Sequence, residues 1–413
     1  MDKTVAERIG IQLMALKQFS ADTTGVTRLP FTKEAAAAVS YLAGCMRAAG
    51  LLVSIDMTGA VHGILPGLSA RRIVLGSHYD SVRCGGAFDG AAGVVCGIEI
   101  VRQFRPREIY YTLEVIALND EEGVRFGGGF LSSKALLGEW SVEQLKLARD
   151  KDGICIYDAM TLAGFAPETL PAAAWQLQDI RCFLEIHIEQ GAVLEQSNCE
   201  LGIVNAIVGM RRYQVRFQGR ADHAGTTPMH LRHDALAASA ELVLAAETAA
   251  RRHSGAVATV GACTVEPNTV NTVPATVVLS LDVRSRQLAD ILAIEAELRA
   301  VLQTAAANRG VAYSLQPILS ADPVNMDAAL QAVLSAGAVA GGYRFMELSS
   351  GAGHDALPMA RKIPTAMVFV PSRGGRSHCP EEYSAVEDLA KAVDIVLYTI
   401  KKMNGEENNE LSQ

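Results

Sequence analysis

Four short, almost wholly apolar segments constrain the fold of this chain more than any other feature. They lie at residues 72–76, 111–118, 182–188 and 365–370. Helical patterns at residues 33–49 and 91–104 alternate with the first two segments. Continuous apolar runs are typical of strands that are buried on both faces, as in a sheet covered by helices on both sides. We therefore expect an α/β domain built on a mixed, mainly parallel sheet.

The pattern changes after about Gly209. Residues 212–218 alternate strictly between apolar and polar, which is typical of a strand with one wet face. Beyond it the expected elements are a helix at 232–252, strands at 256–264 and 275–284, a helix at 288–308 and a strand at 311–319. This β-α-β-β-α-β order is that of a ferredoxin-like split unit. We expect a discontinuous domain, residues 1–209 and 325–413, with a smaller α+β domain, residues 210–324, inserted into it.

Composition excludes several classes of function. The formal net charge of −8 offers no cationic field for nucleic acid or for an anionic membrane surface. No stretch approaches the roughly 20 apolar residues of a membrane span, and the N-terminal segment lacks the apolar core of a signal peptide. The eight cysteines are scattered without a C-x-x-C pair, which is typical of reduced thiols. We expect a cytoplasmic protein that binds neither nucleic acid nor membranes.

Histidines and carboxylates follow each of the four apolar segments. They are His78, Asp80 and Asp89 after the first, Glu121 and Glu122 after the second, His187 at the end of the third and His378 after the fourth. A single such residue is more often a solvated or internally satisfied group. In an open α/β sheet, however, ligands bind at the carboxyl ends of the strands. Four strand ends with matching chemistry therefore indicate one site.

The residue types at these strand ends indicate a metal site. Imidazole and carboxylate ligands without thiolates suit Zn²⁺, Mn²⁺ or Co²⁺. Asp80, two residues after His78, is expected to accept the ring N–H of His78 and to fix its tautomer. Adjacent glutamates cannot both face the same atom. We expect one of Glu121 and Glu122 to bind metal and the other to act as general base.

The inserted segment has polar turns of its own. His223 lies in DHAGTTPM and Asn271 in EPNTVNTVP. Arg284 ends a strand whose alternation places Leu281 and Val283 on the opposite face. Taken alone, Arg284 is a solvated strand end, although its guanidinium also matches the geometry of a substrate carboxylate.

Together these motifs resemble those of the M20 clan of dinuclear metallohydrolases, and within it the amidase branch that hydrolyses N-carbamoyl and ureido compounds. That branch contains allantoate amidohydrolases, N-carbamoyl-L-amino-acid hydrolases and β-ureidopropionases. The resemblance covers nearly the whole chain and is carried by GVTRLPFT, GSHYDSVRCGGAFDG, DEEGVRFGGGFL, EIHIEQG, GIVNAIVGMRRY, DHAGTTPM, EPNTVNTVP, SGAGHDA and FVPSRGGRSHCPEE.

The resemblance implies two divalent ions per subunit, Zn²⁺ or Mn²⁺ or Co²⁺. The metal ligands that it implies are His78, Asp89, Glu122, His187 and His378, with Asp89 bridging. It makes Glu121 the general acid/base, Asp80 the residue that orients His78, and His223 the residue that stabilises the oxyanion. The residues that it assigns to substrate binding are Gln190, Asn271, Arg284, Gly353 and His354.

The reaction that the resemblance implies is hydrolysis of the ureido C–N bond of a small carboxylate, with release of ammonia and carbon dioxide. Conversion of allantoate to ureidoglycine, a step of purine catabolism, is the leading expectation. N-carbamoyl-L-amino-acid hydrolase and β-ureidopropionase are the alternatives, and an M20 aminoacylase or exopeptidase and a non-catalytic metal-binding protein are more distant ones. The inserted domain is expected to be a lid and the interface of a homodimer.

Overall fold

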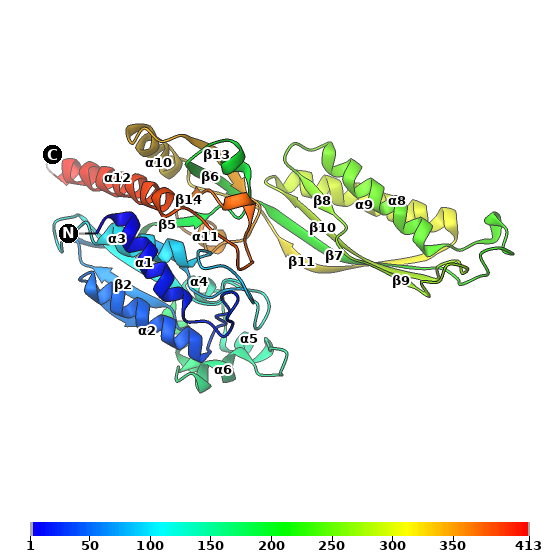
Figure 1. Cartoon of the computed structure of the whole chain (residues 1–413), viewed down its shortest axis with the longest axis horizontal. Helices are drawn as coiled ribbons and strands as arrows, with labels where there is room; N and C mark the ends of the chain where they lie inside the picture. Colours follow the sequence, from blue (N-terminus) through cyan, green and yellow to red (C-terminus); the bar gives the residue numbers. More distant parts are fainter. Residues whose placement is uncertain (1–2, 412–413) are drawn as a thin grey trace. The chain divides into compact units, whose positions relative to one another are not determined.

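The structure is a computed structural model that describes residues 3–411. It divides into two compact units, shown in Figure 1. Unit 1 comprises residues 1–205 and 325–413, and unit 2 comprises residues 206–324.

Unit 1 is built on a nine-stranded mixed sheet with the order β1-β2-β4-β3-β5-β14-β6-β12, and β13 pairs with β6. Its strands are β1 (Leu52–Ile55), β2 (Val61–Leu65), β3 (Ser69–His78), β4 (Tyr111–Leu118), β5 (Ile180–Ile188), β6 (Leu201–Ile207), β12 (Val324–Asn325), β13 (Phe345–Ser350) and β14 (Thr365–Val370). The central strands β4, β3, β5 and β14 run parallel, and β2 and β6 flank them in antiparallel pairing. The expected α/β class and the parallel centre of the sheet are confirmed.

Every residue of β4 and β14 is buried. Helices and loops therefore cover both faces of these central strands. The helices of unit 1 are α1 (Val5–Lys17), α2 (Lys33–Ala48), α3 (Ala91–Val101), α4 (Leu131–Leu136), α5 (Val142–Leu147), α6 (Ile156–Leu162), α7 (Val193–Gln196), α10 (Ala328–Ala340), α11 (Ala356–Met359) and α12 (Val386–Leu411). Helices α1, α3 and α12 pack against one another (Figure 1). All of α3 is buried, and it approaches β5 so closely that a Cβ on Gly93 would lie 2.2 Å from the Ile186 carbonyl oxygen.

Unit 2 is a five-stranded antiparallel sheet with two helices. The strand order is β11-β7-β10-β8, and β9 also pairs with β10. The elements are β7 (Gly209–Gln218), α8 (Ala235–Arg251), β8 (Val257–Thr259), β9 (Cys263–Glu266), β10 (Thr276–Ser285), α9 (Leu288–Arg309) and β11 (Ala312–Ala321). Along β10 buried and half-buried residues alternate, so Leu281 and Val283 lie in the core and Arg284 lies off it, as the alternation in the sequence predicts.

One expected strand of unit 2 is interrupted. Residues 256–264 were expected to form a single strand, but β8 and β9 are separate and pair with different parts of β10. Between them the Ser280 hydroxyl accepts the backbone N–H groups of Gly261 at 3.2 Å and Ala262 at 2.9 Å. The Ser280 N–H still donates to the Ala262 carbonyl at 3.1 Å, but its hydroxyl takes the two N–H groups that a regular ladder would bond to backbone carbonyls. The expectation of one continuous strand was wrong.

Two further observations concern the whole described chain. Within residues 3–411, no helix has both the length and the apolar character needed to cross a membrane. All eight cysteines lie in this range, and each is a free thiol.

His62 on β2 is a buried histidine held by two carboxylates. Its Nδ1 lies 2.7 Å from Glu114 Oε1, and its Nε2 lies 3.2 Å from Asp56 Oδ2. The other oxygen of Glu114 accepts from Arg72 at 2.7 Å. Burial lowers the pKa of His62, but the hydrogen bonds to Asp56 and Glu114 outweigh it and raise the pKa to about 9.

We expect His62→Gln to make stability less dependent on pH. The folded pKa lies above the unfolded value of about 6.5, so protonated His62 stabilises the fold fully below about pH 6.5, and this contribution is lost as the pH rises through about 9. The difference in unfolding free energy between wild type and variant should shrink by up to about 3 kcal/mol across this range. Urea unfolding at both ends of the range measures it, with the exposed His230→Gln as control. A difference that stays constant with pH would show that His62 is neutral in the fold.

Candidate metal centre

The carboxyl ends of four parallel strands bring the sequence-predicted polar residues of unit 1 together. His78 is the last residue of β3, His187 lies near the end of β5, Glu121 and Glu122 follow β4, and His378 follows β14. Since β4, β3, β5 and β14 are neighbours in the sheet, these ends meet at one edge. The sequence predicted this convergence.

Asp89, just before α3, lies at the centre of the cluster. Its Oδ1 is 3.4 Å from His78 Nε2 and 3.1 Å from His187 Nε2, and its Oδ2 is 3.1 Å from His378 Nε2. Glu122 Oε1 is 3.4 Å from the same His378 nitrogen. Asp89 is therefore shared by two sets of possible metal ligands. These sets are His78, Asp89 and His187, and Asp89, Glu122 and His378.

Backbone carbonyls orient the two buried imidazoles. Nδ1 of His78 lies 3.1 Å from the Asp80 carbonyl oxygen, and Nδ1 of His187 lies 2.9 Å from the Ile188 carbonyl oxygen. A carbonyl only accepts, so each Nδ1 carries a proton. Nε2 of the protonated ring donates to Asp89, whereas Nε2 of the neutral ring presents its lone pair on that side. This is the tautomer that metal ligation through Nε2 requires.

Asp80 acts differently from the expectation. Its carboxylate was expected to accept the His78 ring N–H, but Oδ1 lies 3.7 Å from Nδ1, and the carbonyl of the same residue takes that bond. The carboxylate instead accepts the backbone N–H groups of Glu121 at 3.1 Å and Glu122 at 3.2 Å. Consecutive N–H groups at the turn after β4, where Asp120 has a φ of 58°, form a ready anion-binding concavity. Asp80 thereby positions both glutamates.

The electrostatics of the cluster follow from burial and charge. Burial raises the pKa of Glu121 well above its usual range. Burial and the negative charge of Asp89 raise the pKa of Glu122 to about 7. Burial alone would raise the pKa of Asp89 too, but hydrogen bonds from the three surrounding imidazoles hold it well below its usual range. Glu121 and Glu122 thus resist ionisation, whereas the imidazoles around Asp89 favour its ionised form.

The donor set fits divalent cations. Glu122 Oε1 is buried without a hydrogen-bond partner, and such an atom in a fold costs free energy unless another group satisfies it. It faces the same space as the His378 imidazole. Nitrogen and oxygen donors without thiolates suit Zn²⁺, Mn²⁺ and Co²⁺. The cluster is therefore compatible with a dinuclear metal site in which Asp89 is shared.

Gln190 lies beside the cluster. Its backbone has a φ of 60°, in the left-handed region, and its N–H is fixed by the Ser372 hydroxyl at 3.0 Å. The side-chain nitrogen donates to Asp89 Oδ2 at 2.9 Å. The side-chain oxygen is buried without a partner, so it can accept from a further group.

His354 and Gly353 also lie at this edge. The His354 ring is buried, and its centroid lies 4.4 Å from that of the His187 ring. Its Nε2 lies 2.8 Å from the Ser350 hydroxyl oxygen. Burial and the neighbouring His187 hold the pKa of His354 well below its usual value, so the ring is neutral. At Gly353 a Cβ would lie 2.9 Å from the Phe130 ring, so a larger residue here would require that ring to shift.

Glu382 is a further residue of the site, and it is not among the residues expected from the sequence. Its Oε1 accepts the backbone N–H groups of Phe88 and Asp89, both at 3.0 Å. Its Oε2 accepts from the Ser377 hydroxyl at 2.7 Å and from the His378 N–H at 3.3 Å. It therefore fixes two cluster residues that are far apart in the sequence. The only signal was its place in the motif SHCPEE.

The other three expected residues belong to unit 2. His223 is exposed, and its Nδ1 accepts the N–H groups of Gly225 at 3.0 Å and Thr226 at 3.2 Å. Asn271 is exposed on the adjacent loop, where its carbonyl accepts the Ala224 N–H at 2.9 Å.

Arg284 of unit 2 is oriented by a neighbouring carboxylate. Its Nε donates to Asp282 Oδ1 at 2.8 Å, and Arg212 donates to the other oxygen of Asp282 at 2.8 Å. Asp282 thus fixes two guanidinium groups on the wet face of this sheet.

Comparisons with known proteins identify the family of this chain. Residues 74–402 match peptidase family M20/M25/M40. The chain is 40% identical to an N-carbamoyl-L-amino-acid amidohydrolase of Paenarthrobacter aurescens over 98% of this chain and 99% of the relative. It is 37% identical to an allantoate amidohydrolase of Bacillus subtilis, over 93% and 95%. A crystal structure of a hydantoinase/carbamoylase family amidase from Burkholderia multivorans superposes with a TM-score of 0.91 at 31% identity, covering 97% of this chain and 98% of that one. This chain therefore belongs to the M20 family of hydrolases, in the branch of the N-carbamoyl-L-amino-acid and allantoate amidohydrolases.

Proposed function

We propose that this chain hydrolyses the ureido C–N bond of a small carboxylate substrate and releases ammonia and carbon dioxide. The observation that carries the proposal is the position of Asp89, whose two oxygens face different sets of ligands. A carboxylate shared in this way suits a pair of cations. Such a pair can assist the attack of water on an amide-like carbonyl.

Five residues would hold the two ions. Asp89 would bridge them, with His78 and His187 completing one site and Glu122 and His378 the other. When bound, such ions polarise the ureido carbonyl and lower the pKa of an attacking water. Zn²⁺, Mn²⁺ and Co²⁺ all suit these donors.

Glu121 is the proposed general base and acid. Its carboxylate is buried within 3.8 Å of His78 Nε2, and the bond from its N–H to Asp80 fixes its backbone. In this place it would accept the proton of the attacking water and deliver it to the leaving nitrogen.

His223 is the proposed donor to the developing oxyanion. Because its Nδ1 accepts two backbone N–H groups, the proton of the neutral ring lies on Nε2. The exposed Nε2–H can donate a hydrogen bond to the carbonyl oxygen of the substrate. This hydrogen bond would strengthen as negative charge develops on that oxygen. For the substrate carboxylate we propose Asn271 and Arg284, with Gln190, Gly353 and His354 lining the site.

The role of unit 2 completes the proposal. Its residues must approach the substrate, so we propose that unit 2 closes over unit 1 as a lid and that it also forms the interface of a homodimer. We place the protein in the cytoplasm, where thiols stay reduced.

Two substrates have specific support. Allantoate follows from the sequence motifs and from the Bacillus subtilis relative. N-carbamoyl-L-amino acids follow from the Paenarthrobacter aurescens relative. The experiment that decides is ammonia release by metal-reconstituted protein from allantoate, N-carbamoyl-L-amino acids, N-carbamoyl-β-alanine and dipeptides. Turnover of at least one ureido compound is expected, and cleavage of dipeptides alone would overturn the proposal.

We expect His223→Ala to lower kcat by about 10²–10³-fold, the usual cost of losing one oxyanion donor. Metal content should not change, because His223 lies outside the ligand sets. Steady-state kinetics on the preferred ureido substrate measure the effect. His230→Ala removes a nearby exposed imidazole and should leave kcat near that of the wild type. Equal activities of the two variants would remove His223 from the mechanism.

A further inference from the structure

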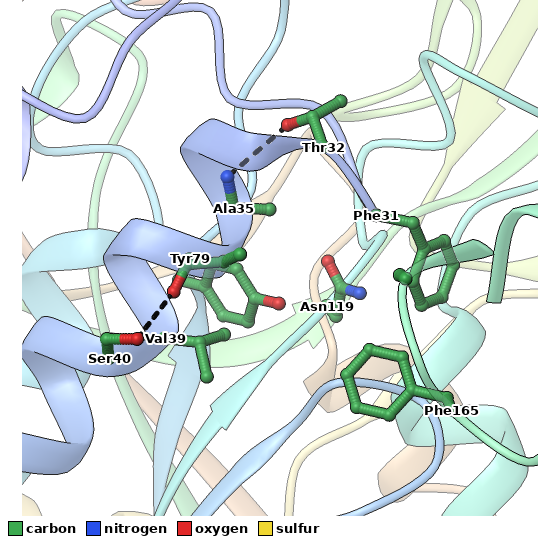
Figure 2. Close-up of a pocket in the computed structure, with 10 residues that line it drawn as sticks. Phe31, Thr32, Ala35, Val39, Ser40, Tyr79, Asn119 and Phe165 are labelled. Carbon is green, nitrogen blue, oxygen red and sulfur yellow. Dashed lines mark hydrogen bonds between the residues drawn. The ribbon is translucent and has the colours of Figure 1, made fainter. Parts of the chain in front are cut away.

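A cavity of about 190 Å³ lies in unit 1 between α2, the ends of β3 and β4, and the segment after α6 (Figure 2). Three aromatic rings line it, those of Phe31, Tyr79 and Phe165, together with the buried Val39. The rings of Phe31 and Phe165 meet edge to face with centroids 6.0 Å apart. The lining contains no charged side chain. Such walls favour a neutral, largely apolar occupant, because a charge would lose its hydration there.

One polar atom of the lining is left without a partner. Asn119 is 1% exposed, and its side-chain nitrogen donates to the Thr58 carbonyl at 2.8 Å. Its side-chain oxygen is buried and accepts no hydrogen bond. Figure 2 shows this amide between the rings of Tyr79 and Phe31. A buried acceptor of this kind costs free energy until a donor reaches it.

The other polar groups of the lining are already satisfied. The Tyr79 hydroxyl donates to the Gly59 carbonyl at 3.0 Å. The hydroxyls of Thr32 and Ser40 donate to carbonyls near the start of α2 and within it, at 2.8 Å and 2.9 Å. Among the side chains of the lining, Asn119 Oδ1 is therefore the buried acceptor that has no hydrogen bond, and a donor on an occupant would satisfy it.

The cavity is separate from the candidate metal centre. Tyr79 lines it, whereas its neighbours His78 and Asp80 do not. Successive side chains of an extended segment point to opposite faces, so alternate residues serve the cavity and the metal centre. An occupant would contact Tyr79 and Asn119, which adjoin residues of the cluster in the sequence. It need not resemble the hydrolysed substrate.

We propose that this cavity binds a small neutral molecule with an apolar body about the size of one aromatic ring and a single O–H or N–H group that donates to Asn119 Oδ1. The size follows from the volume, because an apolar cavity of about 150 Å³ in another protein holds benzene. The donor follows from the orphaned acceptor.

Phenol is the probe that tests the proposal, by calorimetric titration of the full-length protein and by a crystal structure with phenol. We expect saturable binding with a dissociation constant on the order of 1 mM or tighter, and the phenol O–H within hydrogen-bond distance of Asn119 Oδ1. Benzonitrile has the same aromatic ring, but its substituent accepts a hydrogen bond and cannot donate one. It should bind at least about tenfold more weakly, because its acceptor would face Asn119 Oδ1.

Substitutions at the mouth of the cavity locate the binding. Ala36 is an exposed lining residue of α2, so Ala36→Phe should occlude the cavity and abolish phenol binding. Ala37→Phe places the same ring at the next position of α2, outside the lining, and should bind phenol like the wild type. Ala163→Phe occludes the cavity from its other wall, and should abolish binding if Ala36→Phe does not fold. Absence of phenol binding, equal binding by wild type and the occluded variants, or a crystal structure with only a water on Asn119 would overturn the proposal.

Discussion

Replacing Glu121 by Gln should lower kcat on the preferred ureido substrate by about 10²–10⁴-fold, the contribution of a positioned general base. Glutamine has the size of glutamate and keeps the backbone N–H that Asp80 accepts. Its amide cannot take a proton from water at neutral pH. The variant should therefore fold and bind metal while turnover is lost, and ammonia release together with metal analysis measures both.

The next residue provides the matched comparison. Glu122→Gln removes a carboxylate of the same kind one position along the chain, but from the set formed with Asp89 and His378. We expect this variant to lose metal, whereas Glu121→Gln keeps about two ions per chain. Retained turnover in Glu121→Gln would place the base elsewhere. Loss of metal from it would make Glu121 a ligand, an outcome that its proximity to His78 makes worth measuring.

The fold and the convergence of the cluster were predictable because they depend on strong local patterns. The four central strands are buried on both faces, so their sequences are continuous apolar runs. Their parallel pairing then places His78, Glu122, His187 and His378 at one edge, whatever the details of the loops. The edge strand β1 was not predicted, because it has only four residues and is mostly exposed.

Contacts that depend on local backbone conformation were not predictable in this way. Asp80 has two acceptors that the His78 ring could contact, its carboxylate and its backbone carbonyl. The conformation of the turn after β3 decides which of them accepts the hydrogen bond. The interruption between β8 and β9 depends on one hydroxyl, that of Ser280, in a strand that otherwise alternates regularly. Glu382 contacts Asp89 across nearly three hundred residues of sequence, and no short motif encodes that distance.

Asp89→Asn should have a second large effect, namely the loss of both metal ions. The substitution preserves size but removes the negative charge that faces all three imidazoles. Residues that only support a metal ligand already contribute about 10–100-fold to metal affinity. We therefore expect a loss of more than about 100-fold for a residue that is itself a shared ligand. Metal content after dialysis and calorimetric titration with Zn²⁺ measure it.

The number of metal ions that each variant loses distinguishes a metal ligand shared by two sites from a residue that only lies beside the ligands. Because Asp89 belongs to both ligand sets, Asp89→Asn should weaken both binding steps, whereas Glu122→Gln should weaken only one. Glu382→Gln leaves every ligand in place but removes the charge that fixes the Asp89 and His378 backbones, so its effect should fall in the 10–100-fold range of supporting residues. Gln190→Ala removes an amide that contacts Asp89 and His378 but belongs to neither ligand set, so this variant should retain both ions. If Asp89→Asn kept one ion at wild-type affinity, Asp89 would belong to a single site, and a dinuclear centre bridged by this residue would be excluded.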